Sequence, residues 1–199
     1  MKNKFINFTI SFITKYYNYP KEDLQKMKYG IEGIYLTITK CIVIIILALL
    51  LGIFKETVVT LILFNIIRFS GFGFHAEKSY QCLILSILYF INIPLLFINI
   101  NISKLTTVAI CAFCMISYLL FAPADTKKRP LPNKRKRLIR KISTVLIGTI
   151  YSLFIICLSK NFLTPLLLST LVIQALIINP LFYMIFRQPY NNYKSYIRA

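Results

Sequence analysis

The chain has 199 residues, 57% of them apolar, and its 24 Lys and Arg outnumber six acidic residues for a net charge of +18. Mean hydropathy is positive. This apolar content excludes an ordinary soluble domain and predicts one all-α, polytopic membrane domain over residues 1–199. In a soluble protein the charge would suggest nucleic acid, but in a membrane protein topology explains it, so no nucleic-acid partner is expected.

The N-terminal region, residues 1–30, has the pattern of an amphipathic segment. Phe, Ile and Tyr fill residues 1–19 except along one stripe of polar residues at helical spacing, formed by Asn3, Asn7, Ser11, Thr14 and Asn18. We expect a helix lying in the membrane interface, with an ordinary packing helix as the alternative. Pro20 should end it, and a second short helix from Lys21 should end near Gly30.

Apolar runs fill most of the remaining chain. They cover residues 34–54, 57–74, 82–98, 105–121, 142–159 and 162–186. Several have only 17 or 18 residues, so as helices they are about 26 Å long and just reach across the hydrocarbon core of a bilayer. The sequence therefore predicts about six transmembrane helices.

The distribution of positive charge tests this count. With six crossings and a cytoplasmic N-terminus, 21 of the 24 Lys and Arg fall inside, and three, Lys55, Lys104 and Lys160, fall outside. Positive residues collect on the cytoplasmic side of membrane proteins. We therefore expect a multi-pass protein of the cell membrane with both termini in the cytoplasm.

Residues 126–141 are expected to form a basic cytoplasmic loop. They contain nine Lys and Arg, beginning with Lys127, Lys128 and Arg129, and two prolines. Such clusters beside a membrane usually bind anionic lipids. A sharper interpretation, compatible with the first, is that Lys127, Lys128 and Arg129 bind an acidic segment of a peptide substrate.

Reactive side chains gather between the second and third apolar runs. His75 is the only histidine, so it is the one side chain whose ordinary pKa suits a general base near neutral pH. Cys82 follows at the start of the next apolar run, where a helix N-terminus would favour the thiolate. A cysteine activated by a histidine can attack an amide carbonyl. The alternative is an interfacial imidazole and a packed thiol.

Helix geometry limits how this pair could act. Seven residues of straight helix would separate His75 and Cys82 by about 10.5 Å along the axis, beyond hydrogen-bond reach. We therefore expect a loop or broken helix at Gly71 or Gly73. On an intact helix the neighbour of His75 would be Ser79, which makes Ser79 the rival nucleophile.

Two motifs stand out along the chain. The first is Arg68…Gly73-x-His75…Cys82, and the second is the run from Phe121 to Pro130, FAPADTKKRP. Together they resemble the accessory gene regulator protein B family, membrane peptidases that process quorum-sensing peptide precursors. The resemblance covers most of the chain, including its hydrophobic layout. It implies that His75 and Cys82 are catalytic and that Arg68 and Gly73 support them.

The resemblance also implies a reaction. Cys82 would cleave a small precursor through an acyl-thioenzyme, and a Cys or Ser of the precursor would then close a thiolactone or lactone ring. The expected partner is a precursor with an amphipathic N-terminal helix and an acidic tail, and a homodimer stays open. No cofactor or metal is expected with one histidine. The alternative function is a non-enzymatic peptide exporter or a partner of a sensor protein.

A third residue that orients His75 is not identified by the sequence. Glu77, Gln81 and Asp125 each have a side chain that could accept or donate the required hydrogen bond. These alternatives stay open at this stage.

Overall fold

The computed structural model describes residues 2–15, 19–76, 78–126, 130–158 and 161–197. Within these ranges every regular element is helical, apart from one isolated bridge between Phe72 and Ala124. The expected all-α class is therefore confirmed. The chain divides into two compact units, Met1–Leu47 and Ala48–Ala199.

The first unit contains α1 (Lys2–Thr14) and most of α2 (Lys21–Leu50). α1 ends before Pro20, as expected, and the ring of its Phe5 lies 5.3 Å from that of Tyr35. The predicted helix end near Gly30 is wrong, because α2 continues to Leu50. Gly30 and Gly33 cost the helix some stability but do not break it, and the apolar residues after them favour its continuation.

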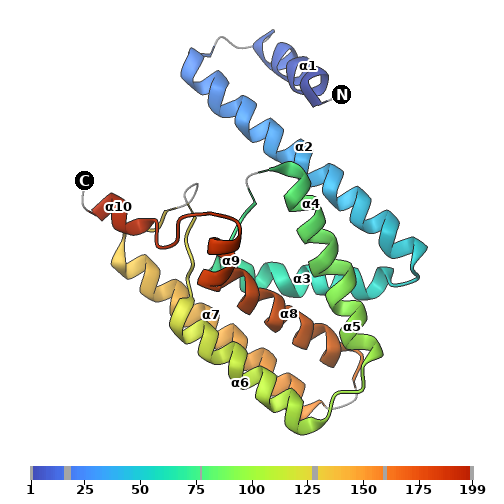
Figure 1. The fold of residues 1–199 in the computed structure, drawn as a ribbon. Helices are drawn as coiled ribbons and strands as arrows, with labels where there is room; N and C mark the ends of the chain where they lie inside the picture. Colours follow the sequence, from blue (N-terminus) through green and yellow to red (C-terminus); the bar gives the residue numbers. More distant parts are fainter. Residues whose placement is uncertain (1, 16–18, 77, 127–129, 159–160, 198–199) are drawn as a thin grey trace. The chain divides into compact units, whose positions relative to one another are not determined.

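The second unit is built around α8 (Leu163–Ile178), which packs against four other helices (Figure 1). These are α3 (Phe54–Gly71), α5 (Ile93–Asn99), α6 (Lys104–Phe121) and α7 (Lys134–Cys157). Eleven of the 16 residues of α8 are buried. A helix that is apolar on all sides is stable at the centre of a bundle, which accounts for this position.

Tyrosine hydroxyls and a glycine fix the helices of this bundle. Tyr118 of α6 donates to the carbonyl of Leu171 in α8 at 2.7 Å, and Tyr151 of α7 donates to that of Leu63 in α3 at 3.0 Å. Gly148 of α7 lies against Tyr118, so closely that a Cβ there would lie 2.8 Å from the ring. These contacts satisfy the hydroxyls inside the protein.

The third apolar run forms one helical segment with a change of pitch. α4 (Ser79–Ile87) passes through a π-helical turn, η1 (Leu88–Asn92), into α5. Pro94 has no N–H and cannot make the regular α-helical bond to Phe90. A π-helical turn next to such a proline is a common way of accommodating the lost bond.

Four helical segments are long and apolar enough to cross a membrane, within the described part of the chain. They are Glu22–Leu50, Ser79–Asn99, Lys104–Phe121 and Lys134–Cys157. α3 contains three charged residues, and α8 is shorter, at 16 residues. The structure is thus that expected of a polytopic membrane protein, and the count of six spans stays a prediction, as does the interfacial position of α1.

Two expected boundaries need correction. The run 162–186 is not one helix, because Pro180 starts a new helix, α9 (Pro180–Ile185), and the Asn179 side chain accepts a hydrogen bond from the N–H of Leu181 at 2.9 Å. The basic loop 126–141 ends at Asn133, whose side chain caps α7 by accepting from the N–H groups of Arg135 and Lys136. Such side-chain caps are strong helix-start signals.

Candidate active site at the break between α3 and α4

The helix breaks between His75 and Cys82, as their spacing requires for a direct pair. α3 ends at Gly71, and α4 begins at Ser79. Phe72 and Gly73 have φ values of 51° and 118°, which turn the chain away from the helix axis. His75 lies exposed in this loop, and half-buried Cys82 lies in the first turn of α4. The expected break at the two glycines is therefore confirmed.

Arg68 holds the first part of the loop. Its guanidinium donates to the carbonyls of Phe72 at 2.7 Å, Gly73 at 3.2 Å and Phe74 at 2.6 Å. Three carbonyls that the broken helix leaves without regular partners thus receive charge-assisted hydrogen bonds. The predicted support residue Arg68 fixes the path of the backbone that leads to His75.

Gly73 is required by space as well as by its backbone angle. A Cβ at this position would lie 2.6 Å from Nη1 of Arg68 and 2.9 Å from the carbonyl oxygen of Ile177. Its φ of 118° is also a conformation that other residues rarely adopt. The structure therefore brings two of the predicted residues, Arg68 and Gly73, into direct contact.

The second motif, which begins at Phe121, pairs with this loop. The N–H of Gly73 donates to Ala124 at 2.8 Å, and the N–H of Ala124 donates to Gly71 at 3.1 Å. α8 also bonds to the His75 loop. The Phe74 N–H donates to the carbonyl of Ile177 at 2.8 Å, and Gln174 Nε2 donates to the Phe72 carbonyl at 3.1 Å. Segments some 50 and 100 residues apart along the chain therefore form one backbone framework around the break.

Asp125 anchors the C-terminal tail. Its carboxylate accepts from the N–H of Tyr193 at 2.8 Å and from that of Leu131 at 3.3 Å, with Arg137 at 3.9 Å. The Tyr183 hydroxyl lies 3.2 Å from the carbonyls of both Ala124 and Asp125. Among the three candidates for orienting His75, Asp125 thus has a structural task, Gln81 is half-buried, and Glu77 lies outside the described residues.

Tyr190 completes this end of the molecule. Its hydroxyl donates to the carbonyl of Phe121 at 3.5 Å. Burial raises the pKa of Tyr190, the Arg137 guanidinium lowers it and the Asp125 carboxylate raises it further. The phenol is therefore protonated and able to donate at neutral pH.

Basic residues border the loop, although they are not the ones predicted. Lys127, Lys128 and Arg129 lie outside the described residues. Arg140 of α7 donates to the carbonyl of Phe69, and its guanidinium stacks 4.4 Å from the Phe72 ring centre. Arg140 belongs to the long basic run 126–141. The sequence of that run does not indicate which of its basic residues lies at the site.

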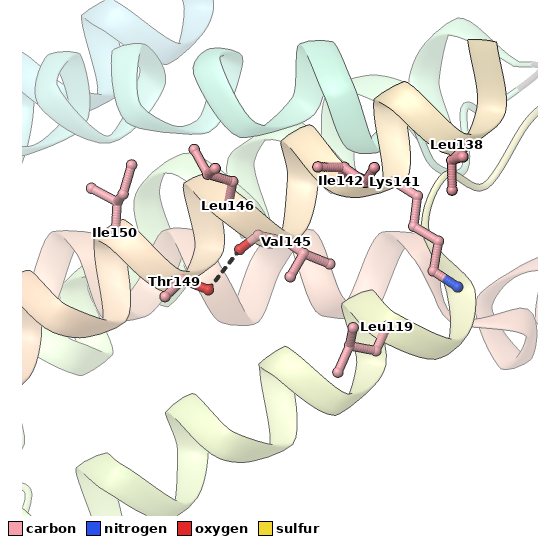
Figure 2. A pocket seen from close by; sticks show the side chains of 8 residues that line it. All are labelled: Leu119, Leu138, Lys141, Ile142, Val145, Leu146, Thr149 and Ile150. Atoms are coloured by element: carbon pink, nitrogen blue, oxygen red, sulfur yellow. Dashed lines mark hydrogen bonds between the residues drawn. The ribbon is translucent and has the colours of Figure 1, made fainter. Parts of the chain in front are cut away.

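A groove of about 540 Å³ lies elsewhere, along the outer side of α6 and α7 (Figure 2). It is lined by Leu119, Leu138, Lys141, Ile142, Val145, Leu146, Thr149 and Ile150. Two of these side chains are polar, Lys141 and Thr149. The Thr149 hydroxyl already donates a hydrogen bond to the carbonyl of Val145 at 2.9 Å. The groove is lined by neither His75 nor Cys82, so it is not the candidate active site.

A family model described as Accessory gene regulator B matches residues 6–178. The chain belongs to this family. Curated members include an AgrB-like protein of Listeria monocytogenes serotype 4a, 33% identical over 180 residues, which are 88% of this chain and 86% of the relative. The corresponding protein of Listeria innocua is 32% identical with the same coverage. Accessory gene regulator protein B of Staphylococcus aureus is 28% identical over 91% of this chain and 95% of its own.

No solved structure matches the chain. Both motifs that carried the resemblance fall within the matched residues 6–178. The framework described above therefore belongs to the part of this chain that makes it an AgrB protein.

Proposed function

We propose that the chain is a membrane-embedded cysteine endopeptidase that processes a small quorum-sensing precursor peptide. His75 accepts the proton of Cys82, and the thiolate attacks a peptide carbonyl of the precursor. The proton on His75 then passes to the leaving amine, and the N-terminal part of the precursor stays on Cys82 as a thioester.

The interrupted helix is the observation that carries this proposal. A continuous helix would keep the two side chains about two turns apart. Instead, residues 72–76 and 78 lie outside the two helices, and the start of this loop is hydrogen-bonded by Arg68, Gln174, Ala124 and Ile177. These bonds hold Phe72, which is not a glycine, at a strained φ of 51°. Backbone strain of this kind gathers at functional sites, which supports a loop that delivers the imidazole to the thiol.

The second half of the reaction is transfer rather than hydrolysis. A Cys or Ser side chain of the precursor attacks the thioester and closes the ring, which releases Cys82 and leaves the precursor's C-terminal tail as the other product. Exchange between two thiols is nearly balanced in free energy, whereas water would destroy the activated bond. Exclusion of water from the site once the precursor is bound would favour the exchange.

The proposed partner has chemistry complementary to the site. An amphipathic N-terminal helix would hold the precursor at the membrane surface, and its acidic tail would bind Lys127, Lys128 and Arg129. With both termini and this site cytoplasmic in the cell membrane, Cys82 is in a compartment that keeps thiols reduced. The basic segment would also contact anionic lipids.

The test compares two candidate nucleophiles in the full-length protein in membranes, with a precursor peptide of the proposed kind as substrate. Cys82→Ala should abolish cleavage while the protein still inserts, and Ser79→Ala should cleave at close to the normal rate. Cleavage that survives loss of Cys82 and disappears with Ser79 would overturn the assignment. Cleavage unaffected by either change would instead favour a non-enzymatic role.

A further inference from the structure

Tyr89 has a buried hydroxyl that makes no hydrogen bond within the described part of the chain. The residue is 8% exposed and lies in the π-helical turn η1. Leaving such a hydroxyl without a partner destabilises the fold. Unpaired buried polar groups are uncommon, and this one lies in the helical segment that carries Cys82, which calls for an explanation.

Contacts with α3 place Tyr89 near the site. The hydroxyl of Thr57 donates to the carbonyl of Phe90 at 3.3 Å, and the Phe90 ring packs edge-on against Phe64 at 5.2 Å. The Arg68 guanidinium lies 5.9 Å from the centre of the same Phe64 ring. η1 is thus fixed against the part of α3 that carries Arg68, the residue that holds the His75 loop.

Helix register puts Tyr89 on the side of Cys82. The two residues are seven apart, which is close to two full turns, so they share a face of the segment formed by α4 and η1, about 10.5 Å apart along its axis. This distance is too long for a direct bond between the two side chains but leaves room between them for the carbonyl group of a substrate. Long helical side chains lean toward the N-terminus, here toward Cys82. The hydroxyl lies within electrostatic range of both the Arg68 guanidinium and the Cys82 thiol.

We propose that the Tyr89 hydroxyl is the hydrogen-bond donor for the oxyanion formed when Cys82 attacks a carbonyl. The inference rests on the proposed function and adds a catalytic residue to it. As the bond from Sγ to the carbonyl carbon forms, the C=O electron pair moves to oxygen, and Tyr89 donates to that oxygen while keeping its own proton. The pair returns when the bond to the leaving group breaks.

This role explains why the hydroxyl has no partner in the free protein. A donor held ready in a low-dielectric site needs no reorganisation when charge develops, and loss of one such donor typically lowers a rate about 10²- to 10³-fold. A donor already engaged with a carbonyl, as in Tyr118 and Tyr151, would have to break that bond first.

The test uses two reagents that react with the same thiol and needs no natural precursor. p-Nitrophenyl acetate acylates Cys82 through an oxyanion, whereas iodoacetamide alkylates it by direct displacement without one. Both reactions are followed at Cys82 by mass spectrometry in the full-length protein in liposomes. For Tyr89→Phe we expect acylation to slow at least tenfold and alkylation to change less than twofold.

Tyr151→Phe is the matched control, because Tyr151 is also 8% exposed and its hydroxyl bonds to the Leu63 carbonyl. It should leave the ratio of the two rates unchanged. Two results in Tyr89→Phe would overturn the proposal. If both rates stay as they are, the hydroxyl has no role in the reaction. If both rates fall in parallel, so that their ratio is unchanged, the hydroxyl acts on the reactivity of the thiol or on the fold. If the proposed function itself were wrong, acylation of Cys82 in the unmodified protein would not depend on His75.

Discussion

Arg68 is the charged residue that holds the backbone of the candidate site. A half-buried guanidinium that donates to three successive carbonyls neutralises the polar groups released by the end of α3. An interfacial arginine that only contacts lipid phosphate would not make these three hydrogen bonds to the backbone. The three bonds support the proposal that Arg68 positions His75.

Arg68→Lys should therefore reduce precursor cleavage at least tenfold while the protein still inserts. Lysine keeps the charge but has a single ammonium, which cannot reach the three carbonyls in the same planar arrangement. Cleavage assays and membrane fractionation of the variant measure the two effects. Normal cleavage by the lysine variant would mean that charge alone suffices.

Gly73→Ala should distort the loop, because the added Cβ meets Arg68 and the Ile177 carbonyl and because φ is 118°. We expect cleavage to fall about tenfold or more and insertion to persist. Gly30→Ala is the matched control, since a Cβ there has nothing within 4 Å and the position is helical. Equal activity of the two variants would show that the loop tolerates the change.

On the scale of elements, close contact between α6 and α7 depends on Gly148. A Cβ at Gly148 would lie 2.8 Å from the Tyr118 ring, so Gly148→Ala must push α7 away from α6, which the Tyr118 hydroxyl ties to α8. We expect a loss of about 1–3 kcal/mol in stability. Thermal unfolding in detergent measures it, with Gly33→Ala, which has open space, as the comparison. No loss in Gly148→Ala would mean that the contact is loose.

Much of this element pattern could be predicted from the sequence. Apolar runs locate the long helices because burial in lipid requires about 17 or more such residues. The break before His75 follows from the helix rise and two glycines. By contrast, the helix break at Asn179 could not be predicted from apolar content, because it depends on the Asn179 side chain that caps α9. The continuation of α2 past Gly30 could not be predicted either, because it depends on whether the cost of a glycine outweighs the stability of a long apolar helix.

The contents of the site were predictable only in part. Residue type and resemblance pointed to Arg68, Gly73, His75 and Cys82. Contacts between distant segments, such as Gln174 with Phe72 and Ala124 with Gly73, depend on the tertiary fold and leave no periodic signal along the chain. Tyr89 was hidden for a similar reason, because one tyrosine in an apolar helix is usually a packing residue.

At the scale of the whole molecule, the charge division predicts a topology that labelling can test. Single cysteines at Asn101 and Asn161, in a protein whose exposed Cys41 and Cys157 are changed to Ser, should react with an impermeant maleimide outside intact cells. A cysteine at Pro132 should react only after lysis. Pro132 is preferred to its neighbour Asn133, which caps α7. Outside labelling at Pro132 would reverse the predicted orientation of that segment.

The central claim is that Cys82 carries the acyl group and that His75 generates its thiolate. The most direct measurement is mass spectrometry of the protein quenched in acid during turnover of its precursor. We expect a thioester adduct with the mass of the precursor's N-terminal portion on the peptide that contains Cys82, lost on treatment with hydroxylamine and absent in His75→Ala. Turnover with no adduct at Cys82, or an adduct on Ser79, would contradict the account.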